Sequence, residues 1–169
     1  LTLVVVGFST KLLPQHFVRF TLLSLFRIFY RQKVLHAERM PEEGGVLILP
    51  NHVTYIDAFI LTAASPRPIR FLMHDNFFKR DGIVAKFVKL FDTVPISPNK
   101  AKEAISIAAE SVAKGAVVCI FPEGQLTRSG GMLEMKRGFE MIARKADCVV
   151  MPVYMDGLWG SIFSFERGQ

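Results

Sequence analysis

Two residues of the chain have the types and the spacing for acid–base chemistry. They are His52 and Asp57, with four residues between them in the run NHVTYID, which directly follows the apolar run VLILP. Residues five positions apart on a regular helix lie about 140° apart around its axis, so the two side chains could not meet there. If His52 instead ends a strand and Asp57 opens the next helix, the turn between them brings the side chains together.

A carboxylate bonded to one imidazole nitrogen sets the tautomer of the ring and leaves the other nitrogen free to accept a proton. Such a pair can remove a proton from an alcohol or from water. The alternative is an aspartate that caps a helix beside an incidental surface histidine. Spacing alone does not decide between these two interpretations.

A second polar cluster, FPEG at 121–124, directly follows the apolar run AVVCI. Taken alone it is typical of a turn with a solvated carboxylate. If both apolar runs are parallel strands, both clusters lie beyond the carboxyl ends of the strands, where α/β proteins bind their ligands. The sequence holds no G-x-S-x-G elbow and no P-loop, and no second His or Cys is spaced to complete a metal site, so no metal is expected.

Strands that alternate with helices must position these clusters. We expect strands at 46–50, 69–73, 93–96, 116–121 and 148–154, the last one broken by Pro152, and helices at 57–64, 82–91, 100–113 and 136–145. This alternation predicts an α/β domain with a mixed, largely parallel sheet flanked by helices.

The N-terminal part of the chain carries aromatic residues at helical spacing. Phe17, Phe20 and Tyr30 belong to this pattern, and arginines interrupt it, which disfavours a membrane span. We expect an amphipathic helix in the membrane interface, with an ordinary helix packed on the domain as the alternative. Residues 1–31 would form this membrane-proximal segment and 32–169 the α/β domain. Because the first residue is Leu, the chain is expected to be part of a longer one.

The composition favours a membrane surface as the anionic partner. Of 169 residues, half are hydrophobic, 15 are Phe, and the net charge is +6. Only 21% are charged, which excludes intrinsic disorder, and no nucleic-acid-binding signature is present. Cys119 and Cys148 both sit in apolar runs, as expected of buried, reduced thiols in a cytosolic compartment.

The two clusters together resemble the motifs of the glycerolipid (lysophospholipid) acyltransferase family, over about residues 34–157. The resemblance implies a domain on the cytoplasmic face of the inner membrane that needs no cofactor. It would move an acyl group from acyl-CoA or acyl carrier protein to a lysophospholipid hydroxyl. His52 matches the base and Asp57 its partner, whereas Asn51, Glu123 and Gly124 match positions associated with the acceptor.

Two departures from the family pattern bear on the acceptor. The family commonly has an arginine in its second motif, where this chain reads VPISP at 94–98, and the basic residue after FPEG is shifted by two positions, to Arg128. These departures make the chain more similar to lysophosphatidylethanolamine acyltransferases fused to an acyl-carrier-protein synthetase, sometimes behind a transporter. Arg128 and Lys136 are candidates for binding the acceptor's phosphate, or else belong to a solvated basic face.

Three other functions stay open at this point. The chain could acylate lysophosphatidate, or it could be a non-catalytic lipid-binding domain of a transporter fusion. A hydrolase that uses His52 to activate water is the third, disfavoured because a membrane acceptor site would have to admit water.

Overall fold

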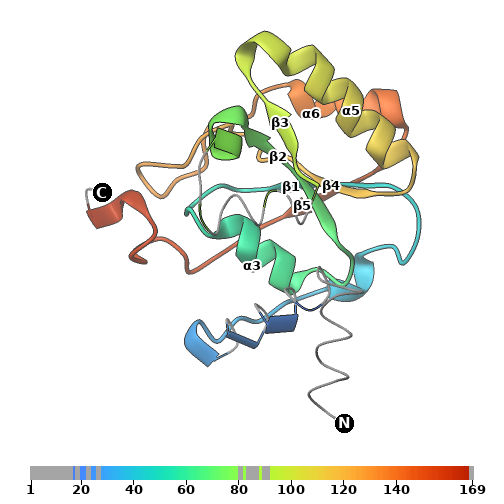
Figure 1. The fold of residues 1–169 in the computed structure, drawn as a ribbon. Helices are drawn as coiled ribbons and strands as arrows, with labels where there is room; N and C mark the ends of the chain where they lie inside the picture. The colour runs from blue at the N-terminus through green and yellow to red at the C-terminus, as the bar shows by residue number, and fades with distance from the viewer. Residues whose placement is uncertain are drawn as a thin grey trace.

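A parallel five-stranded sheet forms the centre of the molecule (Figure 1). The computed structural model describes residues 17, 20–21, 24–25, 28–79, 82, 88 and 92–167. In chain order the strands are β1 (Val46–Pro50), β2 (Ile69–His74), β3 (Val94–Ile96), β4 (Val117–Cys119) and β5 (Val149–Val153). Their spatial order is β3-β2-β4-β1-β5, and each of these pairings is parallel.

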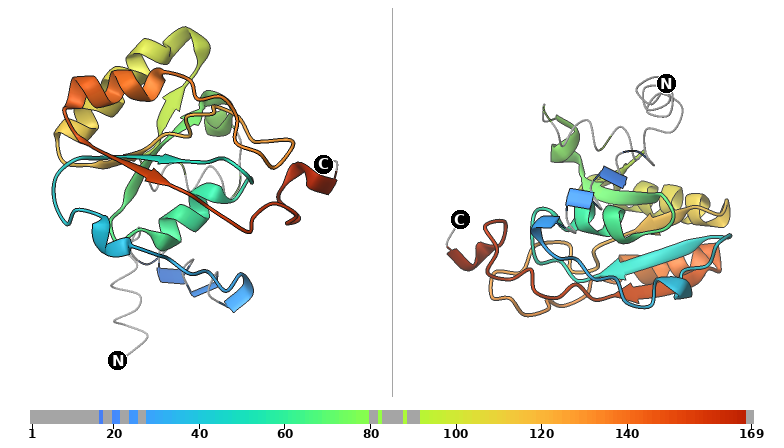
Figure 2. Two further views of the ribbon diagram at one scale, coloured as in Figure 1. Left: turned by 180° about the vertical axis from the view of Figure 1, so that it is seen from behind. Right: turned by 90° about the horizontal axis from the view of Figure 1, so that it is seen from below.

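Helices cover both faces of this sheet. The α-helices with described bounds are α3 (Asp57–Ala64), α5 (Ala101–Ala113) and α6 (Gly138–Ala146). Short 3-10 helices lie at Ala37–Arg39, Asp75–Lys79, Pro98–Lys100 and Phe165–Arg167. Helices α5 and α6 pack side by side on one side of the sheet, and α3 lies on the other (Figures 1 and 2).

The interior strand β1 is apolar throughout because both of its faces are covered. Successive side chains of a strand point to opposite faces, so a strand covered on both faces reads as a continuous apolar run. Val46 and Ile48 join the buried cluster that includes residues of α3, whereas Leu47 joins the cluster that includes residues of α5 and α6. All three side chains are at most 2% exposed.

The α/β class expected from the sequence is confirmed, and β1 and α3 have the expected bounds. The expected break at Pro152 is wrong: β5 continues through Pro152, which lies opposite Leu49. Proline lacks a backbone N–H and is tolerated in an edge strand, and β5 is at the edge of the five-stranded sheet.

Two expected helices fall largely on residues outside the described ranges. Most of the helix expected at 82–91 lies there, as does much of the amphipathic segment within 1–31. The described residues from 17 to 29 are helical, and Phe20, Ile28 and Phe29 among them are exposed. No helix in the described ranges is long and apolar enough to cross a bilayer.

The strand order sets where the polar clusters meet. Because β1 lies between β4 and β5, the segments that leave the carboxyl ends of these three strands are neighbours. These segments begin at Asn51, Ile120 and Tyr154, so the NHVTYID and FPEG runs both lie at the carboxyl ends of the parallel strands.

Candidate active site

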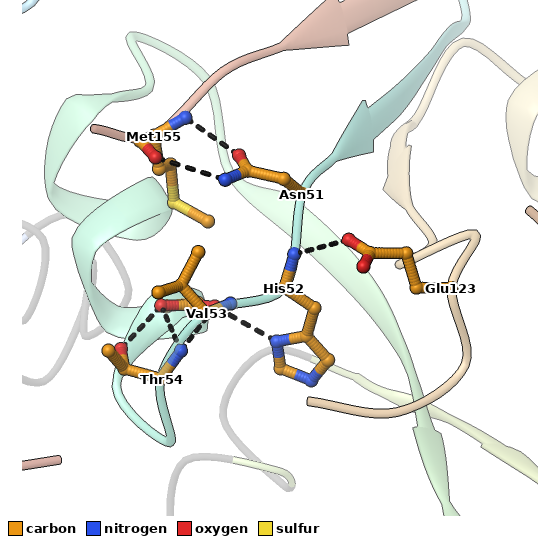
Figure 3. Close-up of polar contacts among 7 residues, drawn as sticks. Asn51, His52, Val53, Thr54, Glu123 and Met155 are labelled. Atoms are coloured by element: carbon orange, nitrogen blue, oxygen red, sulfur yellow. Dashed lines mark hydrogen bonds and ion pairs between the residues drawn. The ribbon is translucent and has the colours of Figure 1, made fainter. Parts of the chain in front are cut away.

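Of the two interpretations of their spacing, the structure shows the hydrogen-bonded pair of His52 and Asp57. The distance from His52 Nδ1 to Asp57 Oδ2 is 2.9 Å (Figure 3). His52 follows β1, Asp57 is the first residue of α3, and the intervening turn brings them together. The Asp57 side chain is fully buried, while 23% of the His52 side chain is exposed. A buried carboxylate therefore holds a histidine that reaches the surface.

The turn between β1 and α3 holds the Asp57 carboxylate in place. The backbone N–H groups of Val53 and Thr54 donate to it at 2.7 and 3.0 Å, and the Thr54 hydroxyl donates to Oδ1. These three donors fix the orientation of both carboxylate oxygens. When Nδ1–H of His52 donates to Asp57, the neutral ring presents Nε2 as a base.

The segment that follows β4 holds the main chain and the ring of His52. The His52 N–H donates to Glu123 Oε1 at 2.8 Å, and the Thr127 N–H donates to the His52 carbonyl at 3.0 Å. The imidazole stacks on the Phe121 ring, with centroids 3.9 Å apart and planes 22° apart. The sequence does not reveal the contact of Thr127, because it joins main-chain atoms, or that of Phe121, because it depends on the adjacency of β1 and β4.

Asn51 and Glu123 are buried, at 7% and 2% exposure, and bonded to the main chain. The Asn51 amide donates to the Met155 carbonyl at 3.0 Å and accepts from the Met155 N–H at 2.7 Å, joining the ends of β1 and β5. The second oxygen of Glu123 accepts from the Leu133 N–H at 2.6 Å. Neither side chain presents its polar atoms to solvent in this structure, and their contact with an acceptor stays a prediction.

Gly124 and Lys136 lie together. Gly124 has φ +70°, a left-handed conformation that glycine adopts without strain, and a Cβ there would lie 2.8 Å from Lys136 Nζ. The Lys136 N–H donates to the Pro122 carbonyl at 2.8 Å. The absence of a side chain at Gly124 thus lets an exposed ammonium lie over the FPEG turn.

Arg128 is the other candidate basic residue in the segment after β4. Its guanidinium carbon is 4.8 Å from the centroid of the Phe165 ring, a cation–π contact, and Phe165 contacts Tyr55 with ring centroids 5.6 Å apart. Tyr55 belongs to the turn between His52 and Asp57. The exposed Arg128 is therefore linked to the histidine turn through two aromatic rings.

A cavity of about 210 Å³ opens beside His52. Besides Asn51, His52 and Glu123, its lining residues include Thr127, Met132, Tyr154, Met155, Leu158 and Trp159. The walls come from the segments after β1, β4 and β5. A larger cavity of about 290 Å³, next to the ion pair of Arg70 and Asp92, has no histidine in its lining. Only the first of these two cavities combines a base with an apolar wall.

The cysteines are poorly suited to nucleophilic attack. Burial raises the pKa of the Cys119 thiol well above its ordinary value, and the charge of Asp57 raises it further. Burial also raises the pKa of the Cys148 thiol. Both thiols therefore stay protonated at neutral pH. Within the described ranges, no group of three or more His, Cys, Asp or Glu could hold a metal ion.

Comparison with known proteins places this geometry among acyltransferases. Residues 31–156 match the family described as Acyltransferase. The chain is 28% identical over 160 residues to the "Probable 1-acyl-sn-glycerol-3-phosphate acyltransferase" of Mycoplasma pneumoniae, covering 89% of this chain and 59% of that protein. It is 25% identical over 139 residues to the 1-acyl-sn-glycerol-3-phosphate acyltransferase of Bacillus subtilis, covering 81% of this chain and 68% of that protein.

A solved structure shares the fold. The crystal structure of the 1-acyl-sn-glycerophosphate (LPA) acyltransferase from Thermotoga maritima superposes with a TM-score of 0.72 at 20% identity. The match covers 92% of this chain and 61% of that one. The chain thus spans about six-tenths of the length of this protein and of the M. pneumoniae relative.

Proposed function

Because the chain belongs to the acyltransferase family, we propose that it transfers a fatty acyl group from an acyl thioester to the free hydroxyl of a lysophospholipid. The observation that carries this proposal is the His52–Asp57 pair, with His52 at the wall of the cavity. The match of residues 31–156 to this family confirms the family resemblance inferred from the NHVTYID and FPEG runs.

In the proposed reaction His52 acts as general base. Its Nε2 takes the proton of the lysophospholipid hydroxyl as the hydroxyl oxygen attacks the thioester carbonyl carbon. The tetrahedral intermediate collapses, the carbon–sulfur bond breaks, and the imidazolium returns the proton to the departing thiolate. Asp57 stabilises the imidazolium between the two steps. A thioester already has a good leaving group, so positioning and proton transfer account for the chemistry without a cofactor.

Lysophosphatidylethanolamine is the acceptor that the basic groups of this chain favour. A lysophosphatidate monoester carries up to two negative charges and is best bound by a bidentate arginine, which the run at 94–98 lacks. Lysophosphatidylethanolamine is a phosphodiester with one negative charge. The ammonium of Lys136 above the FPEG turn or the guanidinium of Arg128 would suffice to bind it. Lysophosphatidate is the second candidate, supported by the names of the M. pneumoniae and B. subtilis relatives.

The proposed partners follow from the same reaction. Acyl-CoA or acyl carrier protein supplies the acyl group, and a bilayer at the cytoplasmic face of the inner membrane supplies the acceptor. The exposed Phe20, Ile28 and Phe29 support contact with that bilayer. Fusion to a transporter or an acyl-carrier-protein synthetase is part of the proposal, supported by the departures from the family pattern at 94–98 and after FPEG.

Thiol release from the thioester tests the proposed function. The full chain is incubated in vesicles with acyl-CoA or acyl carrier protein, without lysolipid, with either lysolipid, and with both in competition. A transferase releases thiol only with a lysolipid, a hydrolase releases it without one, and a binding domain releases none. Faster acylation of lysophosphatidate in the competition would overturn the preference for lysophosphatidylethanolamine.

A further inference from the structure

We propose that Glu123 is a positioning residue for His52 and not a ligand of the acceptor, an inference that rests on the proposed acyl transfer. Glu123 is 2% exposed, and each of its two oxygens accepts a main-chain N–H. One donor is His52, at 2.8 Å, and the other is Leu133, at 2.6 Å. The carboxylate therefore ties the histidine turn to the segment after β4 (Figure 3).

The charge of Glu123 suits this role and does not suit binding of the acceptor. A buried carboxylate is costly unless it is hydrogen-bonded, and main-chain donors to a charged acceptor make short, strong bonds. A lysophospholipid phosphate is also negative, so a carboxylate would repel it. Both oxygens already have donors, which leaves the carboxylate as a bridge between two segments.

Glu123 completes the restraint of His52. The Thr127 N–H holds the carbonyl of His52, Phe121 stacks on its ring, and Asp57 holds Nδ1. Loss of the Glu123 bond leaves the backbone N–H of His52 without a restraint, so the imidazole of this residue can move. A misplacement of about 1 Å in a catalytic group can lower the rate about 10²-fold.

The same carboxylate is bonded next to another part of the cavity wall. Leu133 directly follows Gly130, Gly131 and Met132, which line the cavity that His52 borders. Glu123 thus sets the distance between the base and that wall. Its loss should affect how often the acceptor hydroxyl meets Nε2 in the reactive geometry.

The test compares Glu123→Gln with a matched control in the full chain. Glutamine keeps the size of the side chain but turns one acceptor oxygen into an NH2 group that faces a main-chain N–H. Glu134→Gln makes the same change at an exposed carboxylate one residue beyond Leu133. Glu123→Gln should lower kcat about 10²-fold and leave KM for the lysophospholipid unchanged, whereas Glu134→Gln should change neither.

A ligand role would give the reverse pattern. If KM for the lysophospholipid rises more than kcat falls in Glu123→Gln, the side chain contacts the acceptor and the inference is overturned. A folded variant with unchanged kcat and KM overturns it equally. A fall in kcat without a rise in KM supports the positioning role.

Amide hydrogen exchange tests the bridge without any assay of transfer, so it applies even if the wild-type chain transfers no acyl group or the variant does not fold. In the folded wild-type chain the amides of His52 and Leu133 should both exchange slowly. In folded Glu123→Gln at least one should exchange faster, and in Glu134→Gln neither should. Exchange at the unfolded-chain rate at either amide of the wild-type protein overturns the bridge.

Discussion

Asp57 combines two structural tasks at one residue. Its carboxylate accepts from the N–H groups of Val53 and Thr54, in the turn before α3, and also bonds to His52 Nδ1. The alternative of a helix-capping aspartate is wrong, because the start of α3 has no side-chain cap bond. The same buried oxygens order the turn and set the tautomer of the ring.

Replacement of Asp57 by asparagine tests the second task. An NH2 group facing His52 would donate to Nδ1, so the ring would carry its hydrogen on Nε2 and could not accept a proton there. We expect Asp57→Asn to lower kcat of thiol release by about 10²–10⁴-fold. Thr54→Val is the control, since it removes only the hydroxyl bond to Asp57 and should keep most of the activity. A folded Asp57→Asn chain with more than about a tenth of the wild-type rate contradicts this role.

Alkylation tests whether a thiol takes part in transfer. Because burial raises the pKa of Cys119, its thiol is neutral at neutral pH and unreactive towards iodoacetamide. Mass spectrometry of the folded, treated chain should show Cys119 unmodified and transfer retained, whereas the denatured chain should be labelled at both cysteines. Rapid labelling of Cys119 with a parallel loss of transfer would show that it reacts.

The sequence predicts the His52–Asp57 pair and misses the contacts of Glu123 for a physical reason. The His52–Asp57 pair spans one turn, so residue types and spacing suggest it, and the resemblance to the acyltransferase motifs favours it over a capping aspartate. The contact of Glu123 with His52 joins residues 71 positions apart and uses the backbone N–H of His52, which any residue except proline has. Only the adjacency of β1 and β4 reveals it.

At the scale of elements, Gly45 controls how closely α5 approaches β1. A Cβ at Gly45 would lie 2.0 Å from the carbonyl oxygen of Val112 in α5. We expect Gly45→Ala to reduce the free energy of unfolding by about 1–3 kcal/mol, as for other overpacked sites, measured by urea denaturation. Gly138→Ala is the control, because its nearest contact is an ordinary 3.9 Å to Ile105. Equal stability of the two variants would contradict the close packing.

The N-terminal segment is the element assigned to the membrane. Deletion of residues 1–31 should release the chain from anionic vesicles and leave the sheet folded, because the strands begin at Val46. Each basic residue near an anionic surface contributes about 1 kcal/mol, reduced by salt. Vesicle sedimentation with circular dichroism measures both effects, with neutral vesicles as the control. If the truncated chain binds anionic vesicles as strongly as the full chain, the segment does not hold the protein on the membrane.

Elements with strong local signals were predicted well. The run VLILP is apolar between turn residues, and DAFILTAA opens with an acidic residue, so β1 and α3 have their expected bounds. The sequence does not predict that β5 continues through Pro152, because tolerance of a proline depends on the place of the strand in the sheet. That place is set by pairing with β1, which lies about a hundred residues earlier.

At the scale of the whole molecule, the strand order explains how two weak motifs make one site. NHVTYID and FPEG are about seventy residues apart, yet the order β4-β1-β5 brings their ends together around one cavity. The sequence predicts the α/β class from the alternation of elements. It does not predict this order, because parallel strands of similar apolar composition leave many pairings open.

The central claim is that His52 accepts the proton of a lysophospholipid hydroxyl during acyl transfer. Its most direct test compares the wild-type chain with His52→Ala in the same vesicles, with acylated product and free thiol measured together. The account predicts lysophospholipid-dependent product from the wild-type chain and a loss of about 10²–10⁴-fold in a folded His52→Ala chain. A purified, folded His52→Ala chain that keeps more than about a tenth of the wild-type rate would contradict it.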